Sequence, residues 1–471
     1  MQKTKINWSY FFKAVFTIAL PIALQNLLAT TASMVDTIMI GSRGELSVAA
    51  VGICSQITSL FFSLYFGFAS GGVLFFSQYW GEQNHKGINR AFGVSFIMML
   101  VIGILFGGIC VLFPKFFLRV YTDKQNIIDI AIPYIRIVGF SYPLAAVSAL
   151  VGFLMRATER VKAPLISSII GLSVNFVLNW ILIYGRLGFP AMGAAGAAVG
   201  TLASAIVNLA VLCLFLARSK CDFALNLGEM ISRGDRFFKT YMGKSFPILF
   251  NEIMYGVGQM LINIVIGRQS EAAIAAMAAF RVLEGFVYAF FGGLADAGSV
   301  VVGKEVGSGN HMKGFYYMKG FSLLCPMITF TICLIFVIFS EPLLGLFGLG
   351  AEALIYGKYM LVIYLFAGAI RTCNYIMNCG FRAGGETVYG TVVEIGSLFV
   401  ISVPAVWIAG MIAKLPFLAI FAFVYTDEIL RFVLELRYTN SGKWIKPVTE
   451  QGRKMLPLFK EELTAIKKKP C

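Results

Sequence analysis

The hexapeptides PIALQN at residues 21–26 and PILFNE at residues 247–252 show how this chain is organised. They begin 226 residues apart, and the same spacing brings further identical residues into register without a gap. These matches pair Met34 with Met260, Gly41 with Gly267, Glu45 with Glu271, Gly67 with Gly293, Gly81 with Gly307 and Arg156 with Arg382. A register held over this length indicates two equivalent structural repeats.

The composition places both repeats in a membrane. Of 471 residues, 58% are hydrophobic and 13% are charged, and the mean hydropathy is +0.80. A bilayer core about 30 Å thick needs roughly 20 helical residues to cross it, and a backbone in lipid must satisfy its own hydrogen bonds. The apolar runs are continuous and do not alternate with period two, which argues against a β-barrel. We therefore expect an all-α polytopic membrane protein.

Twelve apolar runs have the length of a membrane span. We expect helices at 15–41, 51–79, 92–114, 129–154, 164–184, 194–217, 245–267, 275–303, 320–340, 356–380, 390–410 and 415–436. Each repeat holds six spans, and an even number returns the chain to the side from which it started. The sequence thus predicts two six-helix bundles related by a pseudo-twofold axis along the membrane normal, an arrangement used by alternating-access transporters.

The loops suggest the domain bounds and the orientation. We expect an N-lobe at 1–217, a cytoplasmic linker at 218–244, a C-lobe at 245–440 and a basic cytoplasmic tail at 441–471. Most of the 39 Lys and Arg residues fall on one side when loops alternate from the N-terminus, so the positive-inside rule places both termini in the cytoplasm. The location of the basic residues in loops on one side of the membrane explains the net charge of +15. The sequence has no aromatic-basic motif, so we do not expect nucleic acid as a partner.

The residues that usually build metal centres are sparse. The nine cysteines show no C-x-x-C spacing and fall largely inside apolar runs, where they are expected to pack as small hydrophobes. The two histidines, His85 and His311, fall in predicted loops. We expect neither a disulfide framework nor a cofactor, and a polytopic enzyme would need a cluster of catalytic side chains that these residues do not supply.

One acidic residue lies deep in the first span. Asp36, in the stretch SMVDTIMIG at 33–41, is surrounded in sequence by apolar residues. A charge at the centre of a span costs at least about 2.5–3.5 kcal/mol on insertion scales and usually marks a functional site. The equivalent position of the second repeat is Ile262, so the carboxylate serves something that only the N-lobe does. The alternative is a structural role in a buried pair or a hydrogen-bonded kink.

Polar partners for Asp36 are available in the fifth and sixth spans. Asn175 and Asn179 lie four residues apart and share a helix face. With Asp36 and the Thr201 hydroxyl, their amide oxygens could surround a Na⁺ ion, or the amides could hydrogen-bond a protonated Asp36. Intramembrane asparagines also often just join neighbouring helices.

These motifs together resemble the multidrug and toxic compound extrusion (MATE) family, over essentially the whole chain. The matching stretches are P-x-x-x-x-N and MVDTIMIG in the first span, RAT at 156–158, N-x-x-x-N-W at 175–180, GFPAMGAAGAAVGT at 188–201 and RAGGET at 382–387. The resemblance implies two six-helix bundles in a bacterial inner membrane. It further implies a monomer that exports amphipathic, often cationic compounds in exchange for Na⁺ or H⁺.

The resemblance also assigns roles to single residues. Asp36, Asn175 and Thr201 match family positions in the first, fifth and sixth spans. Asn179 departs from the pattern, because many relatives carry an aspartate there. One negative charge in place of two leaves proton coupling open beside Na⁺ coupling.

In the C-lobe, three acidic residues are possible cavity groups: Glu252, Glu284 and Asp296. Glu252 matches an acidic residue of one branch of the family, although the tenth-span aspartate of that branch has no counterpart here, and a buried ion pair explains Glu252 equally well. Glu284 lies three residues after Arg281 on one helix face, so these two are expected to pair. We also expect Arg371 and Glu394 to pair.

The expected function is therefore a cation-coupled antiporter that works by alternating access. Three alternatives are also compatible with the sequence. A flippase for lipid-linked or amphipathic metabolites would keep the architecture, and a long basic groove would favour it. A polytopic membrane enzyme and a channel are the other two.

Overall fold

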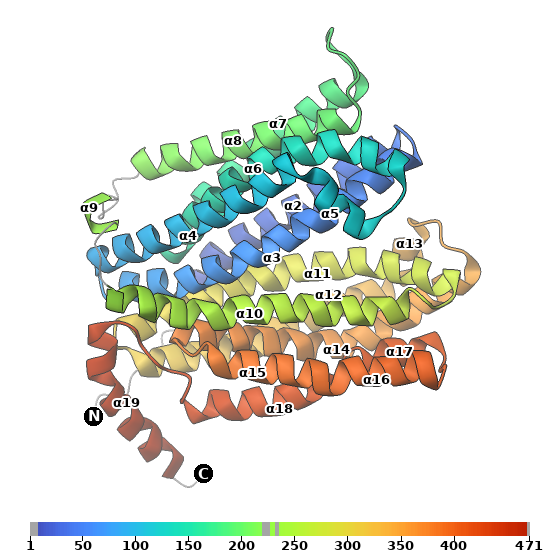
Figure 1. The fold of residues 1–471 in the computed structure, drawn as a ribbon. Helices are drawn as coiled ribbons and strands as arrows, with labels where there is room; N and C mark the ends of the chain where they lie inside the picture. The colour runs from blue at the N-terminus through green and yellow to red at the C-terminus, as the bar shows by residue number, and fades with distance from the viewer. Residues whose placement is uncertain (1–7, 219–226, 231–234, 469–471) are drawn as a thin grey trace. The chain divides into compact units, whose positions relative to one another are not determined.

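The computed structural model describes residues 8–218, 227–230 and 235–468 of the chain. These residues form helices and connecting loops, without a β-strand among them (Figure 1). Part of the expected linker 218–244 lies outside the described residues. Of the nine cysteines, seven are described and all seven are free thiols; five of these are buried, as expected, Cys379 is half-buried and Cys213 is exposed.

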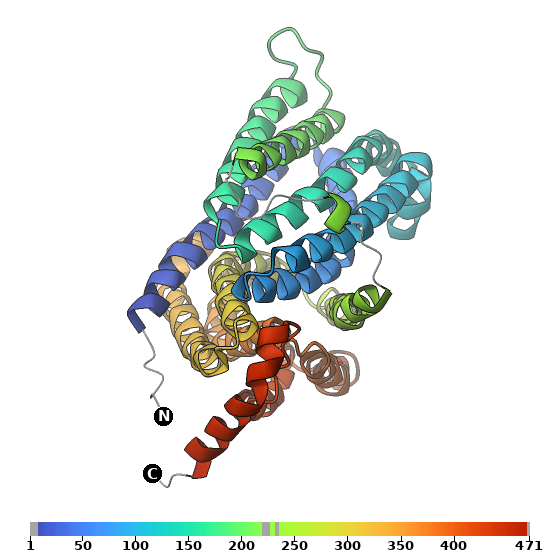
Figure 2. The same cartoon turned by 90° about the vertical axis from the view of Figure 1, so that its left-hand side faces the viewer.

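The first repeat contains nine helical segments before the linker. They are α1 (Trp8–Ala14), η1 (Val15–Ala19), α2 (Leu20–Gly41), α3 (Glu45–Gly81), α4 (His85–Leu112), α5 (Pro114–Tyr121), α6 (Gln125–Ala157), α7 (Lys162–Tyr184) and α8 (Ala194–Arg218). Segment η1 is π-helical and joins α1 to α2 without a loop. Helices α7 and α8 lie side by side in both views (Figures 1 and 2).

The second repeat follows the short helix α9 (Leu227–Met230). Its elements are α10 (Asp235–Ile266), α11 (Glu271–Gly307), α12 (His311–Ile338), α13 (Ser340–Gly345), α14 (Ala351–Gly384), α15 (Val388–Ser397), η2 (Leu398–Ser402), α16 (Val403–Trp407), η3 (Ile408–Ile412), α17 (Phe417–Phe423), α18 (Thr426–Ser441) and α19 (Glu450–Lys468). The eleventh predicted span is thus one continuous helical run that contains two π-helical segments, η2 and η3.

Among the described residues, eleven helices are long and apolar enough to cross a membrane, and each coincides with one predicted span. The twelfth span, expected at 415–436, differs. It is divided between α17 and α18, and α18 carries Asp427, Glu428, Arg431, Glu435 and Arg437, which lower its hydropathy. The two histidines also differ from expectation, because His85 and His311 are the first residues of α4 and α12 and do not lie in loops.

The helices group into two compact units. The first unit comprises residues Met1–Ala23, Ser77–Asn84 and Phe246–Cys471, and the second comprises Leu24–Phe76 and His85–Ser245. The second unit holds most of the first repeat, and the first unit holds the second repeat together with the chain's C-terminal segment. Three helices, α2, α3 and α10, contribute residues to both units. The lobe bounds expected from the repeat stay a prediction.

Within the first unit, the last turns of α3 and α11 meet through glycines. A Cβ atom on Gly81 would lie 2.0 Å from the Lys304 carbonyl oxygen, and one on Gly307 would lie 2.0 Å from the Gln78 carbonyl oxygen. The repeat spacing of 226 residues relates Gln78 to Lys304 and Gly81 to Gly307. The two contacts are therefore equivalent under the repeat. Each requires a glycine, because a side chain there would collide with the facing backbone.

The segment before α19 binds to this crossing. Gln78 accepts a hydrogen bond from the Val448 N–H at 2.8 Å, and the Thr449 hydroxyl donates to the Gly307 carbonyl at 2.8 Å. Glu82 accepts from the Gln451 N–H at 2.8 Å, in the first turn of α19, where a carboxylate is favourable for the helix dipole. The C-terminal segment therefore satisfies polar groups at the ends of both α3 and α11.

Substitution Gly307→Ala tests whether this crossing supports the fold. The added methyl would meet backbone that cannot rotate away, so we expect a loss of about 1–3 kcal/mol of stability, seen as a lower thermal unfolding temperature of the detergent-purified protein. Gly256→Ala on α10 is the control, because a Cβ there meets nothing within 4 Å. Equal unfolding temperatures for the two variants would contradict the close contact.

Candidate functional site

The predicted N-lobe site is assembled by three helices of the second unit. Helix α2 supplies Asp36, α7 supplies Asn175 and Asn179, and α8 supplies Thr201. Asn179 donates a hydrogen bond from Nδ2 to Asp36 Oδ1 at 2.8 Å. The same amide lies 3.0 Å from Asn175 Oδ1, as the four-residue spacing predicts.

Asn175 connects this pair to α8. When its amide is turned by half a rotation, its nitrogen donates to Asp36 Oδ1 at 3.1 Å and its oxygen accepts from the Thr201 N–H at 3.2 Å. This orientation replaces the one in which Asn175 Oδ1 faces the Asn179 amide nitrogen. The Thr201 hydroxyl donates to the Ala197 carbonyl of its own helix at 3.0 Å. In that orientation the Thr201 backbone N–H contacts the site, and the role predicted for its hydroxyl oxygen stays a prediction.

Gly200 explains why α8 comes so close to the asparagines. A Cβ at this position would lie 2.1 Å from Asn179 Oδ1. The small residues of GAAGAAVGT at 193–201 therefore let α7 and α8 pack almost backbone to backbone, as membrane helices with small residues do. The contact of Gly200 was not predicted, because spacing along one helix does not show which helix lies opposite.

The carboxylate of Asp36 is half-buried, and among the described residues no basic side chain pairs with it. Asp36 and Asn175 also line a cavity of about 470 Å³ between α2 and α7. The remaining lining residues are Leu28, Thr31, Ala32, Val35, Ile169, Leu172, Ser173, Phe176 and Val177. The acid therefore borders open space with largely apolar walls.

This arrangement suits one small positive ion. Asn179 is fully buried, and within the described part of the chain its Oδ1 atom receives no hydrogen bond. Carboxylate and amide oxygens are the ligands that a hard cation takes, and the same amides can hydrogen-bond a neutral carboxyl. In the structure Asn179 turns its amide nitrogen toward Asp36 and its oxygen toward Gly200. A proton on Asp36 fits this orientation, whereas a Na⁺ ion would need the amide to rotate, and a single carboxylate limits the attraction for Na⁺.

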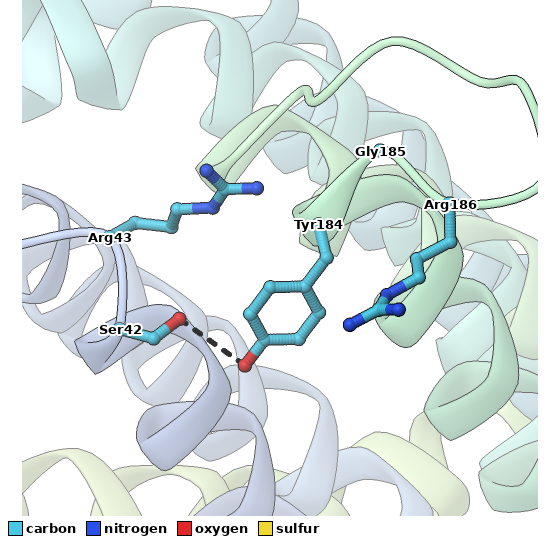
Figure 3. A pocket seen from close by; sticks show the side chains of 5 residues that line it. All are labelled: Ser42, Arg43, Tyr184, Gly185 and Arg186. Atoms are coloured by element: carbon cyan, nitrogen blue, oxygen red, sulfur yellow. Dashed lines mark hydrogen bonds between the residues drawn. The ribbon is translucent and has the colours of Figure 1, made fainter.

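A second cavity of about 470 Å³ lies at the ends of α2 and α7 in the same unit, lined by Ser42, Arg43, Tyr184, Gly185 and Arg186. Figure 3 shows the Tyr184 ring between the two guanidinium groups. The Arg43 guanidinium lies 5.5 Å from the centre of that ring, whereas Arg186 lies over Trp180 at 5.2 Å. Arg43 also donates to the Ile183 carbonyl, so part of its hydrogen-bonding capacity is used by the protein itself.

The C-lobe candidates lie in the other unit, and two of them are paired with arginines. Glu252 accepts from Arg382 at 3.1 Å, and Glu284 accepts from Arg371. Asp296 is half-buried on α11. Of the two sequence-based explanations for Glu252, the structure places it in an ion pair.

Two expected ion pairs are wrong. Arg281 donates to Asn263 on α10 and does not pair with Glu284, which Arg371 reaches from α14. Glu394 pairs with Arg431 at 3.0 Å and not with Arg371. In both cases the observed partner lies on a different helix from the one that we inferred from the sequence. Arg431 was missed as a partner, although its spacing from Glu428 and Glu435 placed three charges on one face of a predicted span.

Each repeat contains the same kind of hydrogen-bonded contact, at equivalent positions. In the second unit, Arg156 donates to Gln25 at 2.6 Å, and Gln25 donates to Ser168 at 2.7 Å. The 226-residue spacing maps these three onto Arg382, Asn251 and Glu394. In the first unit, Arg382 donates to Asn251 at 3.0 Å and Asn251 donates to Glu394 at 2.9 Å. Both repeats therefore contain a chain of hydrogen bonds from an arginine to an amide. The chain ends at the Ser168 hydroxyl in the first repeat and at the Glu394 carboxylate in the second.

A comparison with family models finds MatE at residues 21–181 and 247–408, which together cover more than half of the chain. The chain belongs to the MATE family. The two matches begin at the residues where PIALQN and PILFNE begin, so they confirm the repeat and its register. Members of this family are transporters, and this chain is a multi-pass membrane protein of their all-α, twelve-helix, two-bundle layout.

Similar proteins agree with this assignment. The chain is 23% identical over 405 residues to the probable multidrug resistance protein YoeA of Bacillus subtilis, covering 85% of this chain and 87% of YoeA. It is 22% identical over 437 residues to the probable multidrug resistance protein NorM of Thermotoga maritima, covering 92% and 93%. The crystal structure of MATE in complex with MaL6 and the solved structure of a MOP superfamily transporter from Pyrococcus furiosus share the fold. Each has a TM-score of 0.80 and 97% coverage of both chains, at 19% and 18% identity.

Substitution Asn179→Asp tests how far the missing second carboxylate limits Na⁺ binding. Two carboxylates in hydrogen-bond range attract a cation more strongly than one, so we expect Na⁺ affinity to rise at least about tenfold, or about 1.4 kcal/mol. The measurement is the shift of the thermal unfolding temperature with Na⁺ against choline chloride. Asp129→Asn, on the exposed face of α6, should leave the wild-type response unchanged. An unchanged response in Asn179→Asp would show that this site does not bind Na⁺.

Proposed function

We propose that this protein is a cation-coupled antiporter that exports amphipathic, often cationic compounds by alternating access. Asp36 is the coupling residue, with Asn175, Asn179 and the Thr201 backbone as its supporting groups. The observation that carries the proposal is an acid within a membrane helix that has asparagine partners, no basic partner among the described residues, and a cavity beside it. The names of its relatives, which call them multidrug resistance proteins, support drug export.

The mechanism follows from the cost of charge in an apolar setting. An ionised Asp36 draws the asparagine amides of α7 toward it, whereas an Asp36 that holds a proton or Na⁺ has no net charge to stabilise. Binding therefore favours one packing of α2 against α7 and α8 and release favours another, and a ligand shifts a conformational equilibrium by its difference in affinity for the two states. Substrate release and ion uptake are thereby linked. The coupling ion is Na⁺ or H⁺, taken up from outside the cell while both termini face the cytoplasm.

A flippase for lipid-linked metabolites is the second candidate. The cavity between Arg43 and Arg186 would suit an anionic headgroup, but it is confined to the ends of α2 and α7 and is not continuous along a span. The cavity beside Asp36 is mostly apolar and carries one acid, which suits a positively charged, apolar substrate. These two observations favour export of amphipathic cations.

Substitution Asp36→Asn should abolish ion-driven export, because an amide neither binds a proton nor attracts Na⁺, whereas its size preserves the contact with Asn179. The measurement is transport of a fluorescent cation in proteoliposomes under a Na⁺ gradient alone, a proton gradient alone, or neither. Export by the variant should fall to the rate of empty vesicles under every gradient.

The control is Asp129→Asn, which changes an exposed carboxylate that accepts from Gln125. It should export at the wild-type rate. Folding of both variants is checked by thermal unfolding. Wild-type export by a folded Asp36→Asn variant would refute the assignment of Asp36, and lipid scrambling without cation export would instead support the flippase.

A further inference from the structure

The first unit contains a buried charge cluster that the N-lobe site does not include. It lies among α10, α11, α14, α15 and α18, and its members come from all five helices. The cluster has three arginines, Arg371, Arg382 and Arg431, and six carboxylates, Glu252, Glu284, Glu394, Asp427, Glu428 and Glu435. Three guanidinium groups cannot neutralise six ionised carboxylates.

Arg431 is the centre of this imbalance. Its guanidinium lies 3.0 Å from Glu394, 3.4 Å from Glu428 and 3.6 Å from Glu435. Arg382 and Arg371 are engaged with Glu252 and Glu284, and Arg371 is a further 3.9 Å from Glu428. One positive charge is therefore shared by three carboxylates in a region with little exposure to solvent.

Glu435 is the carboxylate with the poorest solvation. Its side chain is 0% exposed, and within the described residues neither oxygen receives a hydrogen bond. The other carboxylates near Arg431 receive donors: Glu394 from Asn251 and Asn378, and Glu428 from Asn374. An ionised carboxylate without hydrogen bonds in a low-dielectric interior costs several kcal/mol, and a proton removes that cost.

The groups that face Glu435 from the neighbouring helices do not offset its charge. Helix α14 presents Cys373, and α15 presents Tyr389 and Glu394. Its own helix presents Glu428 and Arg431. Of these, Arg431 alone is positive, and it makes closer contacts to two other acids.

The helices that carry the cluster are interrupted beside it. The twelfth span breaks between α17 and α18, and the π-helical segment η2 ends at Ser402, whose hydroxyl donates to Asp427 at 2.6 Å. Interrupted helices occur at ion sites of transporters, because their ends and unwound backbone can face the ion, and π-helical turns are frequent at functional sites. The excess of carboxylates and the interruptions in the helices therefore lie in the same part of the first unit.

We propose that Glu435 is a second proton-binding residue of this transporter, and that its proton takes part in coupling; the coupling role rests on the antiport proposed above. In the described state, a proton on Glu435 leaves Arg431 with Glu394 and Glu428. Release of that proton to water leaves a carboxylate that draws Arg431 away from Glu394, which loosens α18 from α15. Two protons, one in each repeat, then contribute to one cycle.

The first test uses infrared spectroscopy and does not depend on transport. A protonated carboxyl group has a C=O band that shifts in D₂O, and Glu435→Gln should remove one such band at neutral pH. Glutamine has the shape of a protonated glutamate, so the unfolding temperature should stay at the wild-type value. The matched control is Glu450→Gln, which changes an exposed glutamate paired with Lys454 and should leave the spectrum unchanged. Retention of the full carboxyl band in Glu435→Gln would overturn the proposal.

The second test counts protons in proteoliposomes. Glu435→Gln should move fewer protons per exported cation than the wild type, while Glu450→Gln should match the wild type. Loss of the infrared band with an unchanged proton count would overturn the coupling role. If the wild type shows no ion-driven export, the antiporter proposal fails and takes the coupling role with it, whereas the infrared result still decides whether Glu435 holds a proton.

Discussion

An ionised side chain inside an apolar helix bundle must be paired, hydrogen-bonded or neutralised, and this constraint governs both polar regions of the protein. In the second unit, Asp36 is hydrogen-bonded by an asparagine amide, and we propose that it is neutralised by a bound ion. In the first unit, the glutamates meet it with arginines. The N-lobe carboxylate therefore has amide partners and no guanidinium partner among the described residues, whereas most C-lobe carboxylates are held in place by guanidinium groups.

The sequence predicted the features that depend on chain order alone. Eleven spans, the repeat register and the shared face of Asn175 and Asn179 all follow from spacing along one helix or between two copies of a repeat, and the structure has them. The carboxylate of Asp36 and the asparagines were also expected to meet, because an isolated acid in a span needs polar neighbours. That contact, at 2.8 Å, lies in the structure as expected.

The features that the sequence did not predict depend on contacts between helices. Arg281 is three residues from Glu284, yet Arg371 on α14 reaches the glutamate. Spacing ranks neighbours on one helix and says nothing of a side chain that arrives from another helix. The contact of Gly200 with Asn179 has the same origin, because it depends on which helix lies opposite.

The repeat offers a way to separate architecture from function in this protein. Contacts that occur in both units, such as Arg156 with Gln25 and Arg382 with Asn251, belong to the architecture that the two bundles share. Differences at matched positions mark what one bundle does alone: Asp36 opposite Ile262, and Glu394 opposite Ser168. Where Ser168 ends the chain in a neutral hydroxyl, Glu394 ends it in a charge that requires Arg431, and Arg431 brings Glu428 and Glu435 within range. Through Arg431, Glu394 thus links the arginine–amide chain of the second repeat to Glu428 and Glu435, a link that the Ser168 hydroxyl has no charge to make.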